Sequence, residues 1–322
     1  MNIGVERSLE TQLKGKEFRL LFRCDLAALA APKSRFAVPR LLGLEAGLLE
    51  DNTRNEQGAG SMWQRIWAVM LRHLYLHRRS PARIMEIFFW PVMDLLVWGF
   101  ITLYLKTVAV PEAVLFLLGA MIFWDVLYRS QQAISLSMTE EFWVRNFINI
   151  FISPLSIPEF ISALCLVGLL KSLVTTVFLT LLALACYSFN LLQIGPALIP
   201  FLGNLLLFGW AVGLFTMGII LRYGRAAEAL IWGMPFLLQP ISAVFYPLET
   251  LPESLQHVAV CLPSTHIFEG MRQVLSGAGF SLSAMLAAFL LNLVYLALGS
   301  LFFAWMLRSV RERGYLSRQN LH

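Results

Sequence analysis

The chain has 322 residues, of which 58% are hydrophobic and only 14% are charged, and its mean hydropathy is +0.68. Soluble domains are about 45–50% apolar and about 25% charged, so this composition excludes an ordinary soluble domain and predicts an all-α polytopic membrane protein. In such a protein the net charge of +5 belongs to basic segments beside the membrane, and we expect no nucleic-acid partner. The four cysteines have no CxxC spacing, which gives no support for a metal site.

Residues 1–61 contain nine lysines and arginines and no apolar run of span length, and we expect them to form a basic N-terminal extension. They show no secretory signal. We expect either a disordered or regulatory extension or a start assigned too early, since Met62 opens a sequence that would itself serve as a start. The expected membrane domain is therefore 62–322.

Residues 63–77 have the pattern of an amphipathic helix. Apolar side chains recur at helical spacing against a polar face that contains arginines, and they are Trp63, Ile66, Trp67, Met70, Leu71 and Leu74. This pattern predicts a helix that lies in the membrane interface.

Six apolar runs then approach the length of about 20 residues that a membrane span requires. They are Ile84–Leu105, Ala113–Tyr128, Phe160–Phe189, Pro196–Leu221, Ala229–Phe245 and Leu282–Leu307. Arginines gather near alternate ends of these runs, while Lys106 and Arg272 stand on the opposite side. The excess of positive charge marks the cytoplasmic side, so we expect both termini in the cytoplasm.

The segment between the second and third runs contains more aromatic and charged residues than a simple loop needs. Thr139 is an expected helix N-cap, Glu140 and Glu141 would complement the helix dipole, and Pro154 and Pro158 would end the helix. Two interpretations remain open, a helix in the membrane interface and a docking site for a cytoplasmic partner.

Two stretches resemble a known family. "EFWVRNFINIFISPLSIPEF", Glu141–Phe160, resembles the cytoplasmic coupling segment of the permease subunits of type-2 ATP-binding cassette (ABC) exporters. "ISAVFYPLETLPESLQHVAVCLPSTHIFEGMRQVL", Ile241–Leu275, is similar to the stretch after the fifth span of the same family. The order and spacing of the two stretches extend the resemblance over residues 62–322.

The resemblance implies six spans, an interfacial helix before the first and two short re-entrant helices after the fifth. It also implies a homodimer or a pair of related permeases in a bacterial inner membrane, surrounded by lipids, with a separate cytoplasmic ATPase that binds ATP and Mg. The expected ATPase-docking residues are Glu140, Glu141, Phe142, Arg145 and Asn146. The expected exit-gate residues are Phe245, Tyr246, Leu248, His266 and Glu269. The expected function is outward movement of a hydrophobic or amphipathic substrate such as a drug, lipid or glycan.

The residues after the fifth run support broken helices independently of the resemblance. Pro247, Pro252 and Pro263 divide this stretch into pieces too short to span a membrane. His266 and Glu269 are three residues apart but have no third ligand, so a structural hydrogen bond is favoured over a zinc site.

No GxxxxGK[ST] phosphate-binding loop occurs in the sequence, so we expect no ATPase or other enzyme activity from this chain and no cofactor of its own. An ion-coupled secondary transporter is the first alternative. A membrane enzyme that acts on lipids is the second, and it would need acidic neighbours that His73 and His77 lack in the sequence.

Three charged residues lie within apolar runs, namely Asp94, Asp125 and Lys171. Intramembrane charges usually face a partner or a cavity. We expect Lys171 to pair with Asp94 or Asp125 and to fix the packing of the first three spans, and a proton or substrate relay is the alternative. Gly209 and Gly213 form a GxxxG pair, which predicts close helix packing within one chain or between two copies.

Overall fold

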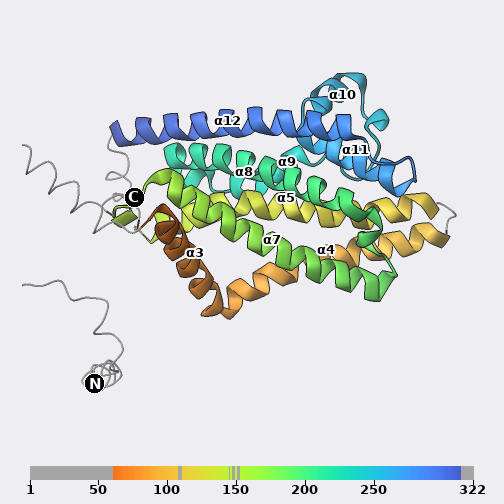
Figure 1. Ribbon diagram of the computed structural model, residues 1–322, viewed down its shortest axis with the longest axis horizontal. Coiled ribbons are helices and arrows are strands. Elements are labelled where there is room, and N and C mark those ends of the chain that lie inside the picture. The colour runs from red at the N-terminus through yellow and green to blue at the C-terminus, as the bar shows by residue number, and fades with distance from the viewer. Residues whose placement is uncertain (1–60, 108–110, 145, 147–148, 151–152, 313–322) are drawn as a thin grey trace, which may run out of the picture. The chain divides into compact units, whose positions relative to one another are not determined.

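The computed structural model describes residues 61–107, 111–144, 146, 149–150 and 153–312, with side chains described from Phe116 onward in the second segment. The expected extension before residue 61 and the docking residue Arg145 lie outside these residues. All secondary structure within them is helical (Figure 1). The α-helices are α3 (Met62–Arg78), α4 (Pro81–Thr107), α5 (Pro111–Trp143), α7 (Ile157–Tyr187), α8 (Leu198–Tyr223), α9 (Leu230–Leu238), α10 (Glu253–Val260), α11 (Pro263–Leu275) and α12 (Leu282–Glu312). Short 3-10 helices lie at η3 (Leu191–Ala197), η4 (Gly224–Ala227) and η5 (Leu248–Thr250).

Membrane-like helices are confirmed for part of the expected set. Within the described residues, four helical stretches are long and apolar enough to cross a membrane, and they are Pro81–Thr107, Ile157–Tyr187, Leu191–Ala227 and Leu282–Glu312. The expected second span lies in α5, which is not one of the four. Its apolar start is followed by Asp125, Arg129 and Gln131. The six-span arrangement therefore stays a prediction.

The expected fifth span, Ala229–Phe245, differs most from the structure. It contains only the nine residues of α9, which extend about 14 Å at 1.5 Å per residue, less than half of a membrane's hydrocarbon thickness. Pro240 then removes a backbone donor, although Gln239 before it still has helical angles of φ −55° and ψ −51°. Beyond it the chain turns, and Ala243 has a positive φ of 50°.

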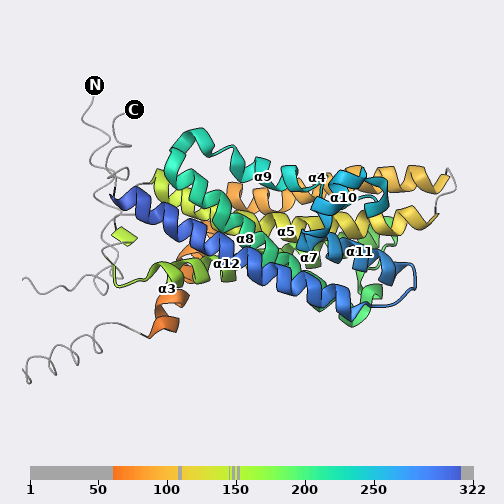
Figure 2. The same cartoon turned by 90° about the horizontal axis from the view of Figure 1, so that it is seen from above.

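Helix α8 lies at the centre of the bundle, between α5 and α12 (Figure 2). Most of its apolar stretch is buried, whereas most of α4 and α12 faces outward. Figure 1 shows α3, the end of α5, the start of α7 and the end of α12 at one end of the bundle, while α10 and α11 lie toward the other. We call the first end the basic end, because Arg72, Arg222 and Arg308 lie on the helices that meet there.

The glycines of α8 allow α5 to approach closely. A Cβ atom on Gly209 would lie 1.7 Å from the Ser130 hydroxyl and 2.6 Å from the Leu127 carbonyl oxygen. A Cβ on Gly213 would lie 2.8 Å from the Gln131 carbonyl oxygen. The GxxxG pair therefore packs against α5 of the same chain.

We expect Gly209→Ala to destabilise the fold by about 1–3 kcal/mol, because the two helix backbones would have to separate. Gly203→Ala on the same helix is the matched control, since no atom lies within 4 Å of its added Cβ. That control should be neutral or should stabilise the helix by up to about 1 kcal/mol. Thermal unfolding of both variants in one detergent checks the prediction, and equal unfolding temperatures would contradict it.

Candidate functional site

Three ion pairs join the α3–α4 region to the α5–α7 region at the basic end. Their closest N···O distances are 2.5, 2.6 and 3.1 Å. The pairs are Arg65–Glu159, Arg72–Glu141 and Arg83–Glu140. We call these six residues the α3 ion-pair cluster. The pairs of Arg65 and Arg72 fix α3 against the start of α7 and the end of α5, and the pair of Arg83 joins α4 to the end of α5.

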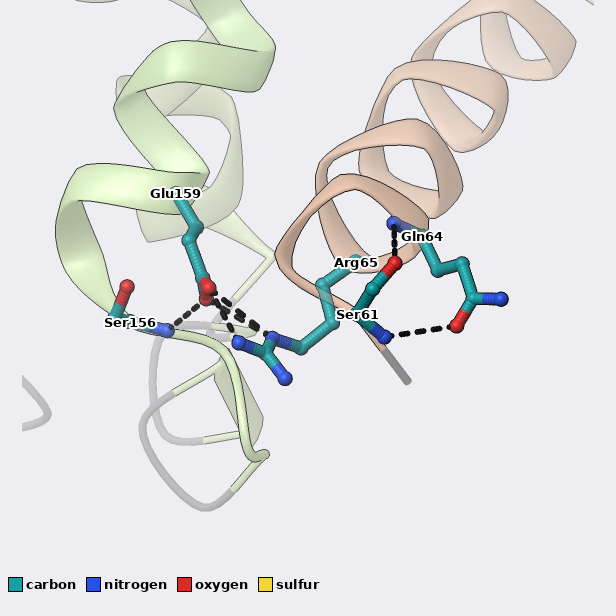
Figure 3. Close-up of polar contacts among 5 residues, drawn as sticks. All are labelled: Ser61, Gln64, Arg65, Ser156 and Glu159. Carbon is teal, nitrogen blue, oxygen red and sulfur yellow. Dashed lines mark hydrogen bonds and ion pairs between the residues drawn. The ribbon is translucent and has the colours of Figure 1, made fainter. Parts of the chain in front are cut away.

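The pair of Arg65 with Glu159 also organises the start of α7 (Figure 3). Arg65 donates from Nε and Nη2 to the carboxylate, and the Ser156 backbone N–H donates to Glu159 Oε2 at 2.8 Å. Ser156 and Glu159 thus form a capping box at the first turn of α7. Helix α3 begins with a similar box, in which the Ser61 N–H donates to Gln64 Oε1 at 2.8 Å. Both helix starts therefore form where their sequences place capping residues.

Glu141 is buried, with only 2% of its surface exposed. Its carboxylate accepts hydrogen bonds from Arg72 at 2.9 Å and from the Asn146 amide at 2.6 Å. Glu140 is held by Arg83, and Phe142 packs against a buried apolar cluster. These residues, which were expected to dock an ATPase, have partners within the chain. Their role in docking stays a prediction. They would support docking by holding the segment between α5 and α7 in place.

The expected helix N-cap at Thr139 is wrong. Helix α5 continues through this residue to Trp143, and the Thr139 hydroxyl donates to the Ser135 carbonyl oxygen at 2.7 Å, one turn earlier. The end of α5 is instead joined to the connection between α8 and α9, because the Trp143 indole N–H donates to Glu228. Glu140 and Glu141 make tertiary ion pairs rather than mark a helix start, and the Thr139 hydroxyl bonds within its own helix.

His73 has a carboxylate neighbour that the sequence did not reveal. The expectation that it lacks one is wrong, because Glu141 Oε1 lies 3.9 Å from His73 Nε2. The ring is buried, and neither of its nitrogens has a hydrogen-bond partner among the described residues. Burial lowers the pKa of His73 to about 4, although Glu141 acts in the opposite direction. Burial likewise lowers the pKa of His77 to about 4.

We expect acid to loosen α3. In the folded state both rings stay neutral down to about pH 4, whereas histidines of an unfolded chain bind protons below about pH 6.5. The neutral rings therefore contribute their full share to the free energy of unfolding above pH 6.5, and this share is lost as the pH falls toward 4. For His73 the loss is on the order of 2 kcal/mol at pH 5. Hydrogen exchange of α3 at pH 7 and pH 5 measures this loss. His73→Phe should reduce it, and an unchanged acid sensitivity would contradict the assignment.

A cavity of about 580 Å³ lies beside the cluster, between α4, α5, α7 and α9. Aromatic side chains line it from three of these helices and from the loop after α9, and they are Trp90, Trp98, Trp124, Tyr128, Trp232, Phe236 and Phe245. Two ring contacts connect the elements: Trp98 stacks on Phe245 with centroids 4.0 Å apart, and Tyr128 meets Phe236 at 5.9 Å. The cavity also contains the three charged residues expected inside the membrane.

The expected pairing of Lys171 with an aspartate is wrong for Asp125. Asp125 pairs with Arg129 at 2.9 Å on its own helix, and Arg129 also donates to the Ile87 carbonyl oxygen of α4 at 2.7 Å. Among the described residues, neither Asp94 nor Lys171 has an ion pair within 4 Å. Arg129, rather than Lys171, joins the first two long helices.

Of the expected exit-gate residues, Leu248 and Glu269 contact each other, whereas Phe245 stacks on Trp98 of α4. Glu269 accepts from the Leu248 N–H at 2.8 Å, the Tyr246 hydroxyl donates to Pro240, and His266 shares a hydrogen bond of 2.9 Å with the Val260 carbonyl. Arg272 was not recognised from the sequence as part of this group. It is buried and binds Glu269, the Val244 carbonyl at 3.1 Å and the Ala243 carbonyl. Its spacing of three residues from Glu269 was the available signal.

The comparisons with known proteins leave the family open. No protein-family model matches the chain, and no curated protein matches it. Within the described residues, no three His, Cys, Asp or Glu side chains come together as a metal site would require. The two stretches that resemble exporter permeases, the cavity and the α3 ion-pair cluster are the features that bear on function.

Proposed function

We propose that the chain is the membrane subunit of an ATP-driven ABC exporter in a bacterial inner membrane. It would act with a second copy or a related permease and would move a hydrophobic or amphipathic substrate outward. A separate ATPase, docked on the segment between α5 and α7, would bind and hydrolyse ATP with Mg. The four apolar helices, the resemblance of the two quoted stretches and the missing phosphate-binding loop support this proposal.

One observation carries most of the argument. Arg83 and Glu140 belong to the α3 ion-pair cluster and also line the cavity. Glu140 lies in the last turn of α5 and is the first of the residues expected to dock the ATPase. A displacement of that segment by a bound ATPase would reach the cavity wall through this pair. The same contact would allow ATP binding to change the access of substrate to the cavity.

The docking step can be tested by co-purification with a co-expressed candidate ATPase. Val144 follows α5 and is 69% exposed, so Val144→Asp should abolish retention of the ATPase without disturbing the fold. Leu192→Asp is the matched control, because Leu192 is 68% exposed but lies in η3, after α7, at its far end from the basic end. The control should retain the ATPase. Equal retention by both variants would place docking elsewhere.

An ion-coupled secondary transporter is the second candidate, and one observation favours it. Asp94 lines the cavity without an ion pair among the described residues, as an ion-binding carboxylate would. Failure of the wild-type chain to retain any ATPase, together with transport driven by an ion gradient in vesicles, would support that alternative.

A further inference from the structure

The aromatic residues of the cavity follow a regular pattern on three helices. Residues four apart lie on the same face of a helix, about one turn from each other. Helix α4 presents Trp90, Asp94 and Trp98, α5 presents Trp124 and Tyr128, and α9 presents Trp232 and Phe236. Asp94 is thus placed one turn from an indole on either side, and the rings of two other helices line the same cavity.

The other charges of the cavity leave Asp94 without a counter-ion. Asp125 is paired with Arg129 and Glu140 with Arg83. Arg129 also lines the cavity, but its guanidinium is already bound to Asp125 and to the Ile87 carbonyl.

Lys171 lines the same cavity from α7. Among the described residues it makes no ion pair within 4 Å, with Asp94 or with any other carboxylate. The part of the cavity around Asp94 therefore combines one unpaired carboxylate with aromatic rings.

We infer that this cavity binds an amphipathic organic cation with an apolar or aromatic body, with Asp94 as its counter-ion. Indole and phenyl faces attract cations within about 6 Å of the ring centre, and a carboxylate within a membrane-spanning helix favours a positive partner. An anion would meet both the ring faces and Asp94 unfavourably. The volume of about 580 Å³ lies within the range of roughly 300–1,000 Å³ that small-molecule sites occupy. The inference deepens the proposed function by naming its substrate class, but binding does not require an ATPase.

Two probes of nearly identical shape and opposite charge provide the test. Tetraphenylphosphonium and tetraphenylborate are titrated separately into the full chain in lipid nanodiscs, and binding is followed by quenching of tryptophan fluorescence. Empty nanodiscs correct for partition of each probe into lipid. We expect saturable binding of the phosphonium ion and no saturable binding of the borate.

Asp94→Asn removes the charge and keeps the shape of the side chain, and we expect it to weaken phosphonium binding about tenfold. Glu253→Gln, an exposed carboxylate on α10 outside the cavity, is the matched control and should bind as the wild type does. Trp90→Leu is the second variant, because Trp90 is 63% exposed and its replacement preserves the fold. It should weaken binding several-fold even if Asp94→Asn fails to fold.

Two results would overturn the inference: equal saturable binding of both probes, or unchanged phosphonium binding by folded Asp94→Asn or by Trp90→Leu. Co-purification with the ATPase is measured separately. Retention of the ATPase without phosphonium binding would remove the cation as substrate and leave the proposed exporter standing. Phosphonium binding without ATPase retention would support the cation site and contradict the proposed ATP-driven exporter.

Discussion

Glu141→Arg is expected to release α3 from the end of α5 and to lower the free energy of unfolding by about 2–3 kcal/mol. The change removes the acceptor of Arg72 and Asn146 and places a second positive charge beside Arg72. Breaking a fully buried ion pair costs about 3–5 kcal/mol. The side chain of Arg72 is 41% exposed, so water screens part of the repulsion and the lower value applies. Thermal unfolding and hydrogen exchange of α3 measure the effect.

The reversed pair provides the control. Arg72→Glu combined with Glu141→Arg restores opposite charges across the same contact, and it should recover most of the lost stability and the protection of α3. Loss of ATPase retention in the single variant and recovery in the double variant would show that the α3 ion-pair cluster supports docking indirectly. A double variant no more stable than the single one would contradict the role assigned to this pair.

Arg272→Met is expected to have the largest effect on stability, about 3–5 kcal/mol, because it removes a buried guanidinium from Glu269 and from two backbone carbonyls. The loop between α9 and η5 has no other side chain that holds the Ala243 and Val244 carbonyls among the described residues. Hydrogen exchange of this loop should rise together with a lower unfolding temperature.

Arg225→Met is the matched control for that change, since Arg225 is exposed at the opposite end of the bundle. Exposed substitutions of this kind usually change stability by less than about 0.5 kcal/mol. Similar unfolding temperatures for the two methionine variants would show that the Arg272 contacts contribute little.

Hydropathy and proline positions were sufficient to predict much of the helical architecture. The apolar runs in α4, α7, α8 and α12 could be recognised because a long apolar run is typical of a membrane span. In lipid the backbone of such a run must satisfy its own hydrogen bonds, and a helix does so. Pro252 and Pro263 stand at the starts of α10 and α11, where proline is tolerated. Whether these short helices enter a membrane stays a prediction.

The charged contacts were less predictable, because each depends on which helices become neighbours. Asp125 finds Arg129 four residues away, a local partner that the spacing on α5 could have revealed. Glu141 and His73 meet only because α3 packs beside the end of α5. No periodicity within either segment encodes that contact. The intramembrane charges of Asp94, Asp125 and Lys171 indicated a partner or a cavity, but the sequence did not show which helices would enclose it.

The α3 ion-pair cluster also has a consequence for the order of events during synthesis. Arg65 and Glu159 are 94 residues apart in the chain. Ribosomes add about 5–20 residues per second, so Glu159 on α7 is synthesised roughly 5–20 s after Arg65 on α3. During that interval its exposed tryptophans, Trp63 and Trp67, are free to rest on the membrane surface. The nascent chain would thus hold α3 at the lipid interface first and attach it to the bundle only after α7 has been made.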